Sequence, residues 1–172
     1  NGLQGGVHIV PSGKAQAVGE KMLGQLLVTK QTGAAGKPVN TVLVAQKMKL
    51  VNEMYFAILL DRASAGPLVI ACSEGGTSIE DLAETHPEKI TRMKIDIRTG
   101  LTEAQARDLA AHLGVKGSIS DAVAQLKALY DVFISSDCTM LEINPLAETA
   151  EAKLIAADAK LNFDDNAEYR QK

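Results

Sequence analysis

A strand-like segment with two polar side chains two positions apart limits the fold more than any other stretch of this chain. It runs from Cys138 to Leu146, and after a short loop a second apolar run covers residues 153–158. Side chains alternate between the two faces of a β-strand, so Glu142 and Asn144 point to the same face. The two runs therefore predict an antiparallel pair. Asp158, at the end of the second run, is expected to share that face.

This expectation fixes the register of the pair. If the three polar side chains share a face, the numbers of paired residues must sum to an even value, because alternation has a period of two. Asn144 opposite Leu154 is one such register. A slip by one residue would send Asp158 to the other face.

Two interpretations of the three polar side chains stay open on spacing alone. A carboxylate, an amide oxygen and a second carboxylate suit a hard divalent cation such as Mg²⁺, which keeps part of its water and shares the rest of its shell with nucleotide phosphates. The alternative is a hydrated sheet rim beside Pro145, which cannot continue the ladder of hydrogen bonds.

Composition narrows the class of protein. The 172 residues are 46% hydrophobic without a run near the length of a membrane span, which argues against disorder and against insertion in a bilayer. The net charge of −3 gives no basic footprint for nucleic acid. Two cysteines, Cys72 and Cys138, are too few for a disulfide scaffold, so we interpret them as core thiols in a reducing compartment.

Capping signals predict two helices in the middle of the chain. Thr77-x-x-Glu80 and Thr102-x-x-Gln105 both match the capping box, in which side chains satisfy the free N–H groups at a helix start. The second of these helices should end at Gly114, since glycine adopts the left-handed conformation that closes many helices.

Hydrophobic periodicity predicts two more helices. Residues 15–30 have an apolar face that suits a helix lying on a sheet, and Ser120 can cap a helix that follows it. The apolar stripe of this last helix, interpreted as core, consists of Val123, Leu126, Leu129, Tyr130, Phe133 and Ile134.

Strand signals complete the expected fold. Residues 39–46 predict a strand, and residues 54–60 and 67–73 predict an antiparallel pair joined by a short turn. Helices and short strands without a βαβ rhythm predict an α+β fold, with mostly antiparallel sheets and helices packed on one side. A boundary is expected near residues 46–50.

The glycine pairs carry weak phosphate signals. Gly5-Gly6 and Gly75-Gly76 could each offer backbone N–H groups to an anion, but neither belongs to a GxGxxG or Walker motif. For Gly75-Gly76 we favour a turn from a strand into the next helix. The histidines His8, His86 and His112 are dispersed and have no metal-ligand spacing.

Several motifs together resemble one family over all 172 residues. They are Thr29–Thr32, the hinge-like residues 42–46, residues 53–58, Asp61-Arg62, residues 73–76, Leu-Glu-Ile-Asn-Pro-Leu at 141–146 and the segment 158–172. In this order they resemble the β subunit of succinyl-CoA synthetase, an ATP-grasp ligase. The resemblance implies residues 1–46 as part of the smaller ATP-grasp subdomain, incomplete here, and residues 47–172 as the larger one. It also implies an internal fragment, inactive alone, because the upstream glycine- and arginine-containing nucleotide loop and a flavodoxin-like domain downstream are missing.

The resemblance implies roles for particular residues. Glu142 would handle a phosphohistidine of the α subunit, and Asn144 and Asp158 would bind Mg²⁺. Nucleotide contacts would come from Val44, Ala45, Gln46, Met48 and Glu53. Ala45-Gln46 stands where the family often has an acidic hinge residue, so the choice between ATP and GTP stays open. From its position alone, Glu53 is equally well interpreted as a solvent-exposed charge at the start of a strand.

The implied activity is the formation of succinyl-CoA from succinate, CoA and a nucleoside triphosphate by an αβ heterodimer. Mg²⁺ and ATP or GTP are the expected cofactor and nucleotide, and neither nucleic acid nor membrane is an expected partner. Alternatives are a sibling ligase acting on malate or citrate, and a non-catalytic assembly or regulatory module. The segment 162–170 suggests the mitochondrial matrix, with the bacterial cytoplasm as the alternative.

Overall fold

The computed structural model describes residues 2–29, 32–76 and 78–171 of the chain. It forms two compact units that divide between Met48 and Lys49. No helix within the described ranges is both long and apolar enough to span a membrane. The identity of the two units with the smaller and larger subdomains stays a prediction.

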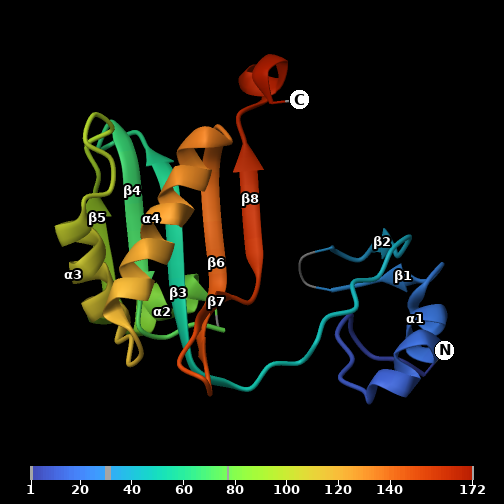
Figure 1. The fold of residues 1–172 in the computed structure, drawn as a ribbon. Helices are drawn as coiled ribbons and strands as arrows, with labels where there is room; N and C mark the ends of the chain where they lie inside the picture. Colours follow the sequence, from blue (N-terminus) through green and yellow to red (C-terminus); the bar gives the residue numbers. More distant parts are fainter. Residues whose placement is uncertain (1, 30–31, 77, 172) are drawn as a thin grey trace. The chain divides into compact units, whose positions relative to one another are not determined.

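One antiparallel sheet organises the second unit (Figure 1). Its strands are β3 (Leu50–Asp61), β4 (Gly66–Cys72), β5 (Ile90–Lys94), β6 (Cys138–Thr149), β7 (Leu154–Ala156) and β8 (Ala159–Phe163). The order is β5-β4-β3-β6, and the outer edge of β6 pairs with both β7 and β8. β8 pairs with the first half of β6 and β7 with the second half. The predicted antiparallel pair of residues 54–60 and 67–73 is confirmed as β3 and β4.

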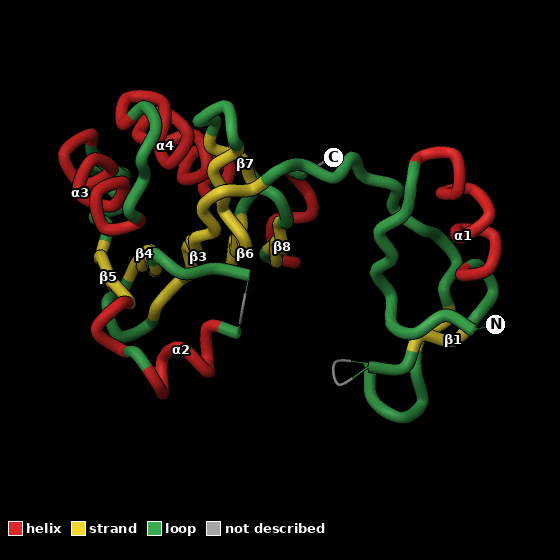
Figure 2. Tube along the Cα trace, turned by 90° about the horizontal axis from the view of Figure 1, so that it is seen from below, coloured by secondary structure: helices red, strands yellow, loops and turns green. Residues whose placement is uncertain are grey.

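Helices cover both faces of this sheet. α3 (Glu103–Leu113) and α4 (Ile119–Ser135) pack on one face and enclose the larger core, while the short α2 (Ile79–Thr85) lies on the other face (Figure 2). There Leu82 of α2 packs with Tyr55, Ala57 and Cys72. The five consecutive residues from Met54 to Ile58 are buried because β3 is central and covered on both sides. The α+β prediction is confirmed, and α2 adds a helix on the face opposite the two longer ones.

The helix ends follow side-chain capping. α3 has the predicted capping box between Thr102 and Gln105, and it ends at Gly114 with a φ of 71°. α2 begins after Ser78, whose hydroxyl accepts from the Asp81 N–H, while Thr77 lies outside the described residues. The predicted cap of α4 at Ser120 is wrong.

Ser118 caps α4 in place of Ser120. Its hydroxyl accepts from the Asp121 N–H at 3.2 Å and also meets the hydroxyl of Ser120 at 2.9 Å, so the helix begins two residues earlier than predicted. The predicted stripe is core except at Ile134, which is 41% exposed. Cys72 and Cys138 are buried free thiols, as predicted.

The first unit departs from two predictions. It contains the 3₁₀ turn η1 (Ser12–Lys14), α1 (Ala15–Met22), β1 (Leu26–Leu27) and β2 (Lys37–Pro38). The helix predicted over residues 15–30 ends at Met22, because Gly24 turns the chain with a φ of 73° and donates to the carbonyl of Val39. The apolar face of residues 15–30 is therefore divided between a helix and a strand.

The strand predicted over residues 39–46 is also wrong. Among the described residues of this unit, strand pairing is limited to Lys37–Pro38 with Leu26–Leu27, and after Val39 no described neighbour completes a ladder. Leu43 is 93% exposed. Among the described residues of this unit none is buried, so its apolar side chains do not form a core.

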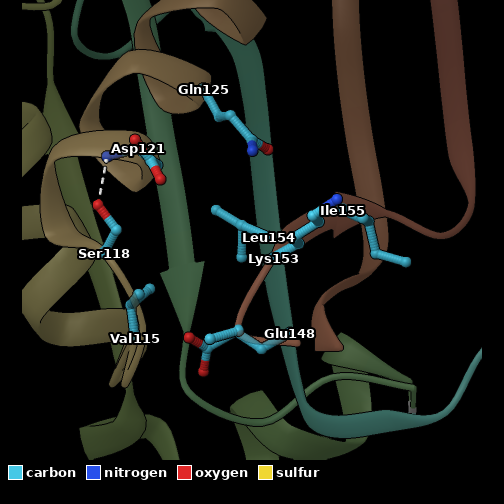
Figure 3. A pocket seen from close by; sticks show the side chains of 9 residues that line it. Val115, Ser118, Asp121, Gln125, Glu148, Lys153, Leu154 and Ile155 are labelled. Carbon is cyan, nitrogen blue, oxygen red and sulfur yellow. Dashed lines mark hydrogen bonds between the residues drawn. The ribbon is translucent and has the colours of Figure 1, made fainter. Parts of the chain in front are cut away.

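A buried carboxylate ties the loop between α3 and α4 to the sheet. Glu148 on β6 is 2% exposed and accepts hydrogen bonds from the Asn52 amide at 3.0 Å, the Lys116 N–H at 3.0 Å and the Gly117 N–H at 2.7 Å. Figure 3 shows it near Val115, at one side of the hollow formed by the start of α4 and the hairpin of β6 and β7. Burial alone would raise the pKa of Glu148, but the donated hydrogen bonds outweigh burial and hold the pKa below its ordinary value.

Replacing Glu148 by Gln should destabilise the second unit. The amide would turn an N–H₂ group toward backbone donors, and we expect a loss of about 1–3 kcal/mol in the free energy of unfolding at pH 7. A carboxylate with a lowered folded pKa stabilises the fold above its unfolded pKa, and this contribution is lost as pH falls through the folded value. The gap between wild type and variant should therefore close below about pH 4.

Urea unfolding measured across pH checks this expectation. Glu151→Gln, on the exposed turn of the same hairpin, serves as the control and should change stability little at any pH. A Glu148→Gln variant as stable as the wild type at pH 7 would contradict the structural role of the carboxylate.

Candidate functional site

The polar side chains found in the sequence lie on two neighbouring pairs of facing residues, here called rungs, between β6 and the segment that returns alongside it. Glu142 pairs with Lys160 on β8. The N–H of Asn144 donates to the carbonyl of Asp158 at 3.2 Å, and the N–H of Ala157 donates to the carbonyl of Pro145 at 3.1 Å. Asn144 thus faces Asp158, at the corner between β7 and β8.

The predicted even register is confirmed from Met140 to Glu148. The particular pair suggested for it is wrong, because Leu154 lies opposite Glu148 and not opposite Asn144. The reason is a tight turn, which is closed by a hydrogen bond of 2.9 Å from the Thr149 N–H to the Lys153 carbonyl. Leu154 follows this turn directly, so it pairs with the residue just before the turn, which is Glu148.

Burial confirms that Glu142 and Asn144 share the face away from the larger core. Leu141 and Ile143, which alternate with them on β6, are 1% exposed and belong to the core under α3 and α4. Glu142 and Asn144 are half-buried, and Asp158 is exposed. The site therefore opens on the side of the sheet where α2 lies.

A tyrosine on the neighbouring strand contacts Glu142. The hydroxyl of Tyr55 on β3 donates to Oε2 of Glu142 at 3.1 Å. Tyr55 is 4% exposed. Burial, followed by the nearby charge of Glu142, raises the pKa of Tyr55 well above its usual range, so the hydroxyl keeps its proton and acts as a donor.

The loop that contains Gly75 and Gly76 contacts the side chain of Asn144. The Gly76 N–H donates to Oδ1 of Asn144 at 2.7 Å, and the Gly75 N–H donates to the carbonyl of Glu53 at 2.9 Å. A Cβ at Gly75 would overlap main-chain atoms of Met54, so only glycine allows this close approach to β3. The predicted turn into a helix is confirmed, and it also fixes an amide oxygen.

Charges of both signs lie near the pair of Tyr55 and Glu142. Glu80 at the start of α2 accepts a hydrogen bond from the Ser78 hydroxyl at 2.7 Å. That bond, and more weakly the positive charge of Lys160, lowers the pKa of Glu80. Lys160 is exposed, so its ammonium group is accessible on the rung of Glu142.

The predicted nucleotide contacts fall into two groups. Glu53 on β3 lies beside Gly76, since an added Cβ at Gly76 would meet its carboxylate, and its contact with a nucleotide stays a prediction. Val44, Ala45, Gln46 and Met48 lie in the first unit, in an exposed segment without helix or strand. Their role in binding a nucleotide stays a prediction.

The donors at the Asn144 rung fit a hard cation with an incomplete protein shell. They are the Asn144 amide oxygen, which also accepts from the Gly76 N–H, and the exposed carboxylate of Asp158. In the described part of the chain no three His, Cys, Asp or Glu residues gather as a metal cage would require. Two oxygen ligands from the protein, with water and phosphate supplying the rest of the shell, would match Mg²⁺ chemistry.

The sequence analysis did not predict Tyr55 or Lys160 as members of the site, nor the contact of the Gly76 N–H with Asn144. The period of two was available for the first two: Lys160 stands two residues after Asp158, and Tyr55 two residues after Glu53. The contact of Gly76 with Asn144 joins segments 68 residues apart and has no local signal.

Comparison with known proteins decides the family. A family model described as an ATP-grasp domain matches residues 1–148. The chain belongs to the ATP-grasp domain family. The expected ATP-grasp fold is thereby confirmed.

Similarity to individual relatives covers the whole chain. It is 60% identical to the mitochondrial ADP-forming succinate–CoA ligase subunit beta of Solanum lycopersicum and 57% identical to that of Arabidopsis thaliana. It is 44% identical to the mitochondrial GDP-forming subunit beta of Columba livia. All of the chain aligns in each case, but it spans only 42%, 41% and 44% of the length of these relatives.

Solved structures agree on the fold. The ATP citrate lyase of Methanothrix soehngenii, in complex with citrate and coenzyme A, matches with a TM-score of 0.66 over 92% of this chain and 35% of that one, at 19% identity. PH1788 of Pyrococcus horikoshii matches with a TM-score of 0.51 over 70% of this chain and 52% of that one, also at 19% identity. At these identities the likeness concerns the fold alone.

Replacing Gly75 by Ala should disturb the site through the backbone. The new methyl group would overlap the main chain of Met54, so the loop must move and the Gly76 N–H loses Asn144. We expect a loss of about 1–3 kcal/mol in stability, the usual scale of overpacking.

Gly66→Ala on β4 is the matched control, because its added Cβ would meet the Ile95 carbonyl oxygen at an ordinary 3.5 Å. Urea unfolding and the amide NMR shift of Gly76 give the measurement. A Gly75→Ala variant with unchanged stability and an unchanged Gly76 signal would show that the close approach to β3 is not required.

Proposed function

We propose that this chain is the nucleotide-binding ATP-grasp part of a succinate–CoA ligase β subunit. The observation that carries the proposal is the pair of rungs on β6, where Asn144 faces Asp158 and Glu142 faces Lys160. One rung offers oxygen ligands to a cation, and the next offers a carboxylate beside a positive charge. Whole-chain identities of 57–60% to proteins named succinate–CoA ligase subunit beta support the same conclusion.

The proposed reaction converts succinate, CoA and a nucleoside triphosphate into succinyl-CoA, a nucleoside diphosphate and phosphate, through a phosphohistidine on an α subunit. Asn144 and Asp158 would hold Mg²⁺, and Mg²⁺ bound there would neutralise charge on the phosphate oxygens. Glu142 accepts the N–H of the partner's imidazole, orients the ring and stabilises its protonated form. The half-buried position of Glu142 strengthens that interaction relative to bulk water.

The nucleotide is proposed to contact Val44, Ala45, Gln46, Met48 and Glu53. Relatives with both ADP-forming and GDP-forming names lie above 40% identity, so this similarity alone does not choose between ATP and GTP. We place the complex in the mitochondrial matrix, as an αβ heterodimer. Support comes from relatives named mitochondrial or hydrogenosomal.

Two substitutions in a full-length β subunit carrying this sequence, assembled with its α subunit, test the two rungs separately. Glu142→Gln should leave Mg²⁺-nucleotide binding intact and slow phosphorylation of the partner histidine by about 10²-fold or more, the scale of a positioned acid–base or electrostatic group. Asp158→Asn should weaken the Mg²⁺-dependent part of nucleotide binding and spare the metal-independent part.

Rapid-quench phosphorylation and calorimetry with and without Mg²⁺ give the two readouts. Asp108→Asn, on the exposed side of α3, controls for the loss of one carboxylate charge and should change neither. Wild-type phosphorylation kinetics in Glu142→Gln would reduce this residue to a structural member of β6 and remove the proposed role.

A further inference from the structure

Tyr55 is built into the sheet so that its ring is fixed and its hydroxyl reaches one carboxylate. The ring packs in the small cluster under α2 with Ala57, Cys72 and Leu82. The residue is 4% exposed, so its χ angles have little freedom, and its hydroxyl needs a partner that the cluster does not supply. That partner is Oε2 of Glu142, at 3.1 Å.

An irregularity in the strand pairing aims this side chain. On either side of Tyr55 the pairs are Met54 with Leu146 and Phe56 with Ile143, so one residue of β3 faces two residues of β6. Bulges of this kind redirect side chains and recur beside functional sites. Tyr55 lies on the same face as Ala57, which is the direct partner of Glu142, and it reaches Glu142 along the diagonal.

The contact with Tyr55 makes the two carboxylate oxygens of Glu142 different from each other. Oε2 accepts from Tyr55, and within the described residues no donor bonds to Oε1, whose lone pairs can accept from another donor. On the opposite side of β6, Lys160 occupies the neighbouring position of the rung. The carboxylate of Glu142 therefore has one oxygen anchored by the buried Tyr55 hydroxyl, and the positively charged Lys160 lies on its other side.

We infer that Tyr55 is a positioning residue: its hydroxyl anchors Glu142 so that the free oxygen of the carboxylate meets the N–H of the partner's histidine. The inference rests on the proposed function of Glu142. A carboxylate held in one orientation before the imidazole arrives loses less freedom on contact, which lowers the barrier without adding affinity for nucleotide. Burial keeps the tyrosine protonated, as its raised pKa requires of a permanent donor.

The chain offers a matched control in a second buried tyrosine. Tyr130 on α4 is 5% exposed and lies in the larger core on the other face of the sheet. Its hydroxyl has no hydrogen-bond partner within the described ranges. Tyr130→Phe removes a buried hydroxyl of the same kind without breaking a hydrogen bond to Glu142.

The experiment uses Tyr55→Phe in the full-length αβ complex. Phe keeps the ring that packs against Ala57 and Leu82, so the variant should fold, and its thermal unfolding midpoint reports that it does. We expect phosphorylation of the partner histidine to slow about tenfold, the scale of one hydrogen bond to a charged group. kcat should fall while KM for the nucleotide and Mg²⁺-nucleotide affinity stay unchanged. Tyr130→Phe should leave all of these values at wild type.

The double variant Tyr55→Phe/Glu142→Gln shows whether Tyr55 acts through Glu142. It should be no slower than Glu142→Gln alone, because an anchor has no effect once the anchored carboxylate is gone. Wild-type phosphorylation in Tyr55→Phe, or a full tenfold loss added to that of Glu142→Gln, would overturn the inference.

These outcomes separate the inference from the function on which it rests. A slow Glu142→Gln enzyme with a wild-type Tyr55→Phe enzyme removes only the role of Tyr55. A wild-type Glu142→Gln enzyme removes the proposed role of the carboxylate itself, and the role of Tyr55 with it.

Discussion

The site depends on the tight turn that joins β6 to β7. Its closing hydrogen bond, from the Thr149 N–H to the Lys153 carbonyl, sets which residues of the returning chain face β6. From that turn inward Glu148 meets Leu154, Asn144 meets Asp158 and Glu142 meets Lys160. Because side chains alternate, a slip by one residue would send Asp158 and Lys160 to the other face of the sheet. Both rungs would then be lost, although neither touches the turn.

The two faces of the sheet separate stability from chemistry. The face under α3 and α4 holds the large apolar core, which fixes β3 and β6 as rigid neighbours. The face under the short α2 is only partly covered, so polar groups such as Glu142 and Asn144 are half-buried there. They are shielded enough for strong hydrogen bonds and accessible enough for a ligand. The loop of Gly75 and Gly76 lies against β3 on this side and supplies a backbone donor to Asn144.

Local sequence signals were sufficient to predict much of the fold around the site. The capping box of α3 and the antiparallel pair of β3 and β4 depend on neighbours within one helix turn or one hairpin, and both formed as predicted. The shared face of Glu142 and Asn144 follows from alternation alone. Residues 39–46 have a strand-like composition, but a strand also requires a partner, and no neighbouring strand pairs with them within the described residues. The contacts of Tyr55 with Glu142 and of Gly76 with Asn144 join distant segments, so composition and spacing could not reveal them.

We propose that Asn144 and Asp158 bind a metal ion next to the pair of Glu142 and Lys160. A crystal structure of the full-length αβ complex with Mg²⁺ and a non-hydrolysable nucleoside triphosphate tests it most directly. We predict a cation about 2.0–2.1 Å from Oδ1 of Asn144 and from a carboxylate oxygen of Asp158, with phosphate oxygens and water completing the shell. A cation bound to the phosphates by other residues, with both of these side chains beyond coordinating distance, would contradict the account.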